Sequence, residues 1–251
     1  MHHGRFNTAA YSVYPNEDVL FDIAYADDAL LVVEKPAGVV TQPGKKHMRD
    51  SLLNGLFARY GHPLQNLGEA RQWGLLHRLD RDTSGLVIVA LRQRAYDDLF
   101  DQFKNRRVKK TYWALVAGSP RTAQGVIQTP ILEVVGARKK AIAGRRGKPA
   151  ITAFRVLAVG KGVSLVEARP KTGRLHQIRV HFAEMGCPVV GEDVYADRHR
   201  LPAAGRLCLH AAGLSFVHPE TRQRVTVRSP WPSDLVKTLR RVGIKPPTHD
   251  S

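Results

Sequence analysis

The chain has 251 residues, of which 43% are hydrophobic, and its formal net charge at neutral pH is +17. These values suit a packed core in one large domain or two small ones, and the excess of cations favours a polyanionic partner such as nucleic acid or an acidic membrane. No apolar run approaches the ~18 residues of a membrane-spanning helix, and residues 1–20 lack the apolar core of a secretory signal. We therefore expect a cytoplasmic protein whose two cysteines, Cys187 and Cys208, are reduced.

The N-terminal part of the chain begins with polar, irregular residues 1–18, which we expect to form a flexible arm. The apolar and turn patterns that follow predict strands at residues 19–25, 30–34 and 86–91, and helices at residues 51–60 and 93–105. Gly61 stands where the first of these helices is expected to end, because glycine is common just beyond a helix C-terminus.

A dense polar loop precedes the third strand, in the stretch from His77 to Ala90. The strand itself is a continuous apolar run, which is typical of a strand buried on both faces. An acid at the entrance to such a strand is costly unless it is paired or used, so Asp80 is a candidate for chemistry. The alternative is a turn in which Asp80 and Ser84 bond their own backbone.

The C-terminal part of the chain is richer in strands. Strands are predicted at residues 111–117, 151–159, 163–168, 207–216 and 224–227, and helices at residues 175–186 and 232–242. The period of two in the first strand places Lys110 and Tyr112 on one face. Strands outnumber helices and many are neighbours in sequence, so we expect an α/β (α+β) fold whose central sheet is mixed, mostly antiparallel and flanked by helices.

A basic, glycine-punctuated segment without acids spans residues 136–148. Its cations include Arg138, Lys139, Arg145 and Arg146. The segment is either a solvated hairpin or a loop that contacts phosphates, and the sequence alone leaves both interpretations open.

Arg179 lies beside the apolar stripe of the helix predicted at 175–186, where Phe182 is its neighbour one turn on. A buried guanidinium needs a carboxylate or phosphate partner, and Asp80 is the natural candidate. The alternative is that Arg179 extends to water from the edge of the stripe.

Other chemistries find little support in the sequence. His176 and His181 lie five positions apart, whereas zinc-binding pairs on a helix prefer a separation of four, and no acidic third ligand is near. Nucleotide-binding and serine-hydrolase motifs are also missing from the sequence. We therefore expect side-chain chemistry with a carboxylate as the nucleophile or base.

Three ordered segments resemble the RluA-type RNA pseudouridine synthases: His77-Arg78-Leu79-Asp80-x-x-Thr83-Ser84-Gly85, Lys110-x-Tyr112, and Thr172-Gly173-Arg174-x-His176-Gln177-x-Arg179-x-His181. Lys35-Pro36-x-Gly38 and Arg206-Leu207-x-Leu209-His210-Ala211 resemble two further segments of that family. The resemblance covers residues 19–228. One departure is Glu192, where the family usually has Asp, and we expect its effect to be small and local.

The resemblance implies that uridine in RNA is isomerised to pseudouridine without a cofactor or metal. By this resemblance Asp80 is the nucleophile, which attacks either the ribose or the base, and Arg179 is its partner. Tyr112 stacks on the target base and takes the proton from C5. Arg78 fills the place of the flipped nucleotide, because a base cannot be rearranged inside a stack. The expected substrate-binding residues are Arg78, His77, Thr83, Arg174, His176, Arg138, Lys139, Arg145 and Arg146.

The resemblance also implies the pseudouridine synthase fold, with residues 19–251 as a single catalytic domain and no S4-like module ahead of it. We expect a monomer that binds ribosomal RNA, transfer RNA or both, and no membrane. Two other functions stay open: an RNA-binding assembly factor or chaperone that uses the same fold without turnover, and a hydrolase of nucleosides or glycosides. The second commonly needs another carboxylate, for which Asp82 is the nearby candidate.

Overall fold

The computed structural model describes residues 11–134, 140–197 and 202–249. The strands are β1 (Asp22–Ala26), β2 (Leu30–Lys35), β3 (Ser84–Ala90), β4 (Lys109–Ala117), β5 (Gln124–Ile127), β6 (Ile131–Val134), β7 (Lys140–Ala143), β8 (Thr152–Gly160), β9 (Val163–Pro170), β10 (Leu209–Val217) and β11 (Arg224–Arg228). The helices are α1 (Leu52–Leu67), α2 (Gln93–Lys104), α3 (Gln177–Glu184) and α4 (Ser233–Arg241), with a 3₁₀ segment at Glu69–Gly74.

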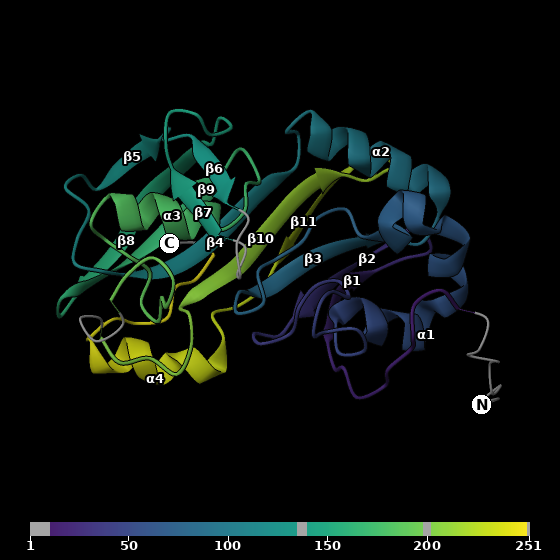
Figure 1. Ribbon diagram of the computed structural model, residues 1–251, viewed down its shortest axis with the longest axis horizontal. Coiled ribbons are helices and arrows are strands. Elements are labelled where there is room, and N and C mark those ends of the chain that lie inside the picture. The colour runs from purple at the N-terminus through teal and green to yellow at the C-terminus, as the bar shows by residue number, and fades with distance from the viewer. Residues whose placement is uncertain (1–10, 135–139, 198–201, 250–251) are drawn as a thin grey trace.

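A single large sheet runs through the molecule in the order β1-β2-β3-β10-β4-β9-β8-β5, and β11 pairs with β10 (Figure 1). The β3–β10 pair is parallel, and the other pairs of this sheet are antiparallel. The strands β6 and β7 form a separate hairpin. The prediction of a mixed, mostly antiparallel sheet flanked by helices is confirmed.

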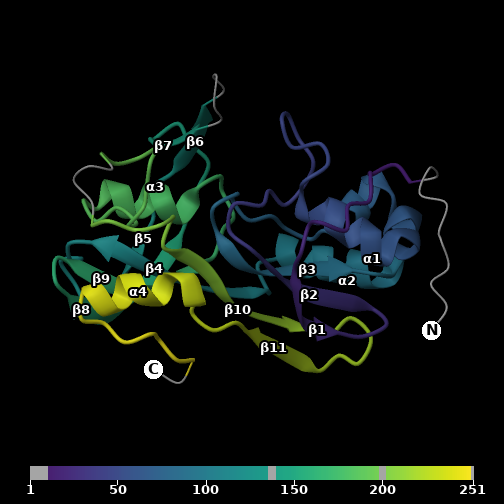
Figure 2. The same ribbon diagram turned by 90° about the horizontal axis from the view of Figure 1, so that it is seen from below.

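The helices cover both faces of this sheet. Along β10, Leu209 and Ala211 pack into the clusters beneath α3 and α1, whereas Ala212 and Leu214 pack into the clusters beneath α4 and α2. Because side chains alternate across a strand, α1 and α3 share one face and α2 and α4 share the other. Figure 2 shows α1 and α3 on the opposite side of the sheet from α4.

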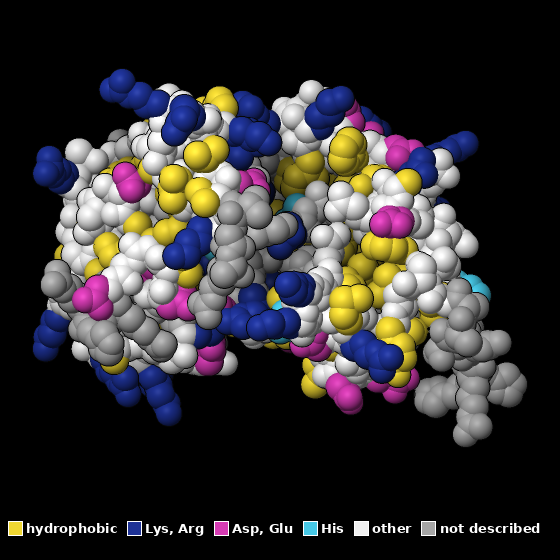
Figure 3. Space-filling model, in the orientation of Figure 1, with side chains coloured by type: hydrophobic (Ala, Val, Ile, Leu, Met, Phe, Trp, Pro, Cys, Tyr) yellow, Lys and Arg dark blue, Asp and Glu magenta, His cyan; other side chains and the backbone are white. Residues whose placement is uncertain are grey.

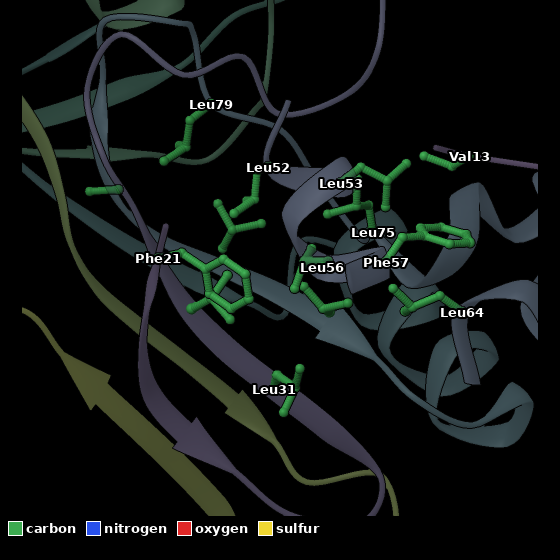
Figure 4. Packing of buried hydrophobic residues seen from close by; sticks show 14 residues of the cluster. Val13, Phe21, Leu31, Leu52, Leu53, Leu56, Phe57, Leu64, Leu75 and Leu79 are labelled. Carbon is green, nitrogen blue, oxygen red and sulfur yellow. The ribbon is translucent and has the colours of Figure 1, made fainter. Parts of the chain in front are cut away.

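The helix α1 closes one of these clusters with its leucines and Phe57 (Figure 4). It begins at a capping box, in which Ser51 Oγ accepts from Asn54 N and Asn54 Oδ1 accepts from Ser51 N. The helix kinks at Tyr60 and then continues to Leu67, with Pro63 in its second part. The predicted end at Gly61 was therefore wrong, because the chain resumes helical geometry after the kink.

Residues 11–18 contain no helix or strand, and the first ten residues of the expected arm lie outside the described ranges. The described part runs beside α1: Val13 is buried in its cluster, and Asn54 Nδ2 donates to Tyr14 O. Both cysteines are buried thiols. Within the described ranges, the helices are too short or too polar to cross a membrane.

Candidate active site

The loop that carries Asp80 is held from both sides by the end of β2 and by the segment that follows it. Thr41 Oγ1 donates to Leu79 O at 2.9 Å and accepts from Leu79 N at 3.0 Å. On the other side of Asp80, Arg81 O accepts from Lys35 Nζ at 3.0 Å and from Gly38 N at 2.9 Å. The two neighbours of Asp80 are therefore fixed by backbone and side-chain hydrogen bonds.

Lys35 is a buried cation with three acceptors. Its Nζ donates to the carbonyl oxygens of Pro36, Val39 and Arg81 at 2.7, 2.7 and 3.0 Å. Burial lowers the pKa of Lys35 to about 7, and the nearby Asp80 carboxylate opposes this effect. The three carbonyl oxygens match the three N–H groups of an ammonium.

The loop enters β3 through Gly85, which lies against β10. Its φ is +113°, and a Cβ there would lie 2.3 Å from Ala211 O. Only glycine fits this position, because it permits both the left-handed backbone and the close approach. The parallel pairing of Ser84 with His210 and of Gly85 with Ala211 thus sets where the loop ends.

The helix α3 brings Arg179 to Asp80. Arg179 Nη1 lies 3.6 Å from Asp80 Oδ2, so the predicted partner is within ion-pair distance. The shorter contacts go to Glu192: Arg179 Nε and Nη2 donate to its two carboxylate oxygens at 2.7 and 2.6 Å. Arg179 does not extend to water, since its side chain is 7% exposed.

Glu192 is fully buried and also accepts from the backbone N–H groups of Asp193 and Val194. Burial opposes its ionisation, but the bonds and charge of Arg179 outweigh burial and hold the pKa of Glu192 below its ordinary value. Burial likewise lowers the pKa of Arg179, and Glu192 outweighs it in the opposite direction. Sequence reasoning missed Glu192 as the main partner of Arg179; its only signal was an acid directly after Gly191.

His176 precedes α3 and faces the other oxygen of Asp80. Its Nε2 lies 3.8 Å from Asp80 Oδ1, and its Nδ1 lies 2.5 Å from the hydroxyl of Tyr195. Burial lowers the pKa of His176, with Asp80 acting against it. His181 points elsewhere and contacts Thr152 Oγ1 and Thr129 O, so the two histidines do not share a site.

Tyr112 and Lys110 lie on the same face of β4 as Ala114, as the strand period predicts. Tyr112 packs where the clusters beneath α1 and α3 meet. Burial raises the pKa of the Tyr112 phenol, and the charge of Asp80 raises it further. Burial lowers the pKa of Lys110 to about 8.

A cleft of about 570 Å³ lies between the two halves of the sheet, β1-β2-β3 and β4-β9-β8-β5, which β10 joins; it is lined by Asp80, Tyr112, His176 and Arg179 among others. Figure 3 shows Lys and Arg side chains around the hollow between these halves. The polar and charged residues that line the cleft are His77, Arg78, Asp80, Thr83, Lys104, Arg106, Lys110, Tyr112, Glu133, Lys171, Thr172, Arg174, His176, Gln177 and Arg179. The wall therefore carries many more cations than acids, as a polyanionic ligand requires.

The predicted substrate-binding residues divide into three groups. His77, Arg78, Thr83, Arg174 and His176 line the cleft. Besides His176, which contacts Tyr195, two of these five residues have structural contacts: His77 Nε2 accepts from Ile88 N, and Arg174 Nε donates to Pro149 O. Thr83 Oγ1 is buried and has no hydrogen-bond partner among the described residues.

The basic segment is only partly described. Arg145 and Arg146 are exposed in the turn after β7 and do not line the cleft, while Arg138 and Lys139 lie outside the described residues.

Comparisons with known proteins identify the family of this chain. A family model described as RNA pseudouridylate synthase matches residues 29–184. The chain belongs to the RNA pseudouridine synthase family. An uncharacterized RNA pseudouridine synthase of Bacillus subtilis is 38% identical over 230 residues, which cover 90% of this chain and 75% of the relative. The ribosomal large subunit pseudouridine synthase D of Zymomonas mobilis is 35% identical over 228 residues, covering 87% and 72%.

The solved structure of the human RNA pseudouridylate synthase domain containing 1 is similar to this synthase. Its TM-score is 0.70 at 29% identity, and the match covers 94% of this chain and 92% of that one. The predicted fold and the predicted class of enzyme, an RNA-modifying isomerase, are therefore confirmed.

Proposed function

We propose that this synthase converts uridine to pseudouridine in ribosomal RNA, with Asp80 as its nucleophile. The observation that carries the proposal is the Asp80 carboxylate, held in the cationic cleft with Arg179 Nη1 3.6 Å from one oxygen. Relatives named for the ribosomal large subunit support the substrate class. Transfer RNA is the second candidate, which the sequence resemblance alone favours. We propose a monomer in the cytoplasm.

The reaction breaks the bond between ribose C1′ and N1 of uracil and forms a bond between C1′ and C5. The C5 proton is lost and N1 gains a proton, so the product is an isomer. Asp80 attacks either C1′ or the base, and the covalent intermediate prevents loss of one half of the nucleotide while uracil turns. If Asp80 is bound to C1′, the bond from C1′ to Asp80 breaks as the bond from C1′ to C5 forms; if Asp80 is bound to the base, its bond breaks after the C–C bond has formed. In both routes Asp80 leaves as a carboxylate.

Tyr112 takes the C5 proton in this scheme. In the free enzyme its pKa is raised, so the phenol carries its own proton at neutral pH. Once Asp80 has formed a covalent bond its negative charge is gone, and one of the two effects that raise the pKa of Tyr112 disappears. Because a protonated phenol cannot accept a second proton, Tyr112 in this scheme first gives its proton to N1 of the uracil and then, as the phenolate, takes the proton from C5 after the nucleophilic step.

The target base must leave its stack to reach Asp80, since the cleft is concave and the side chain of Asp80 within it is only 21% exposed. Arg78 is exposed at the cleft and is suited to fill the vacated position. The unpartnered hydroxyl of Thr83 is suited to a polar group of the flipped nucleotide, because buried hydroxyls normally have a partner.

The test is tritium release from C5-labelled RNA, with large-subunit ribosomal RNA and transfer RNA transcripts as separate substrates. We expect release from the ribosomal RNA, with pseudouridine as the product. Release from transfer RNA alone would overturn the ribosomal assignment. Binding without release would indicate an assembly factor, and free uracil or an abasic ribose would indicate a hydrolase.

A further inference from the structure

The hydroxyl of Tyr195 joins two elements of the site. Ala141 N of β7 donates to Tyr195 Oη at 3.1 Å, and the same oxygen lies 2.5 Å from His176 Nδ1 at the start of α3. The Tyr195 ring also lies beneath the guanidinium of Arg179, whose Cζ is 5.3 Å from the ring centroid. Tyr195 therefore contacts both residues that face Asp80.

These contacts favour one direction for the hydrogen bond between Tyr195 and His176. Tyr195 Oη accepts the N–H of Ala141 and has one proton of its own to donate. If that proton goes to His176 Nδ1, the imidazole carries its proton on Nε2 and presents an N–H to Asp80 Oδ1, 3.8 Å away. The opposite arrangement would direct the Nε2 lone pair at the carboxylate, which is repulsive.

The backbone of His176 indicates that this placement is imposed. Its φ is +50°, in the left-handed region that residues with a Cβ disfavour, and strained residues of this kind persist where their surroundings hold them. The hydrogen bond to Tyr195 is one of the contacts that hold the imidazole there.

We propose that Tyr195 is a positioning residue of the reaction, which holds His176 as the Nε2–H tautomer so that Asp80 lies between an imidazole N–H and Arg179. Each oxygen of the carboxylate then faces one donor, at 3.8 and 3.6 Å. Tyr195 does not touch the reacting atoms and acts through His176. The inference rests on the proposed role of Asp80.

Nitrogen-15 NMR of the imidazoles in the full-length wild-type protein at neutral pH tests the tautomer directly. We expect His176 to show an N–H at Nε2 and a hydrogen-bonded, unprotonated Nδ1, with the signal assigned by its loss in His176→Gln. A wild-type His176 protonated at Nδ1 alone, or at both nitrogens, overturns the inference whether or not any Tyr195 variant folds.

Tyr195→Phe tests the consequence for catalysis. The single-turnover rate at saturating RNA should fall roughly tenfold, the size expected for one lost hydrogen bond that orients a catalytic group, while RNA affinity stays within about twofold. The double variant with His176→Gln should be no slower than His176→Gln alone, because both changes remove the same interaction. The matched control is Tyr25→Phe in β1, which removes a hydroxyl that donates to Asp27 at 2.6 Å. This variant should keep the wild-type rate.

A Tyr195→Phe protein with the wild-type rate, or a double variant in which the two losses multiply, contradicts the inference. Failure of the proposed function is a separate result, since in that case the wild-type protein itself releases no tritium from any labelled RNA.

Discussion

At the scale of single residues, the site depends on a buried pair that the sequence did not reveal. The sequence pattern predicts that Arg179 needs a carboxylate, and the structure places three beside it, those of Glu192, Asp193 and Asp80. Glu192 follows Arg179 by thirteen positions across a turn, so no helical or strand period links the two. Because Glu192 neutralises Arg179 with both oxygens, Asp80 is oriented by the guanidinium without a close bidentate bond to it.

Glu192→Gln should destabilise the protein, because it leaves the buried charge of Arg179 without its main partner. Losing one member of a buried pair costs about 3–5 kcal/mol, which corresponds to a melting temperature lower by on the order of 10 °C. Calorimetry at neutral pH checks this. Asp193→Asn is the control: its carboxylate is 3.5 Å from Arg179 but 48% exposed, so its loss should change stability little.

The same pair predicts a pH dependence. The pKa of Glu192 is lower in the folded protein than its ordinary value of 4.5, so its contribution is fully present above that value and is lost as the pH falls through the folded pKa. The difference in melting temperature between wild type and Glu192→Gln should therefore shrink below about pH 4.5. If this difference in melting temperature stayed constant down to the lowest pH at which the protein folds, the ionised Glu192–Arg179 pair would not be its source.

At the scale of elements, hydrophobic periodicity predicts the helices and the long strands, because each buries a regular face. The strands β5, β6 and β7 were not predicted, since each has four residues and several of these are exposed. Tyr60 lies at the kink of α1, where the helical pattern is interrupted and then resumes. The attachment of the Asp80 loop to Thr41 is also invisible in sequence, because 38 positions separate Thr41 from Leu79.

Thr41→Val should loosen the Asp80 loop while conserving side-chain volume. It removes both hydrogen bonds between Thr41 Oγ1 and the backbone of Leu79. A buried backbone group without a partner costs about 1–3 kcal/mol, so we expect lower stability and slower turnover with unchanged RNA affinity. The control is the same Thr-to-Val change at the exposed Thr226 of β11, where we expect little effect on stability or turnover. Slower binding in place of slower turnover would refute a role in holding the loop.

At the scale of the whole molecule, the net charge of +17 predicts a polyanionic partner, and family membership identifies that partner as RNA. The mixed sheet was predicted from the number of strands and from how many of them are neighbours along the chain. The spatial order of the strands in the sheet could not be read from the sequence. In the sheet, β10 lies between β3 and β4, although more than ninety residues separate it from each. The cleft arises from this order, because β10 joins the half that carries Asp80 to the half that carries Arg179.

The basic segment should bind the RNA backbone without reading its sequence. Changing Arg138, Lys139, Arg145 and Arg146 together to Ser should flatten the log–log salt dependence of affinity by roughly 2–3 units, since each neutralised phosphate of a single strand contributes about 0.7. Turnover at saturating RNA should stay near wild type. The matched control replaces four exposed cations away from the cleft, Arg224, Lys237, Arg240 and Arg241. An unchanged slope with a shifted modification site would mean that the segment selects the target.

The most direct test of the account compares Asp80→Asn with Asp82→Asn. Both changes remove one negative charge from the same loop, but Asp82 is 36% exposed and pairs with Arg81, away from Arg179. We expect Asp80→Asn to abolish pseudouridine formation while RNA affinity stays within a few fold, and Asp82→Asn to keep turnover. Substantial turnover by purified Asp80→Asn, or an equal loss in both variants, would contradict the assignment of Asp80 as the nucleophile.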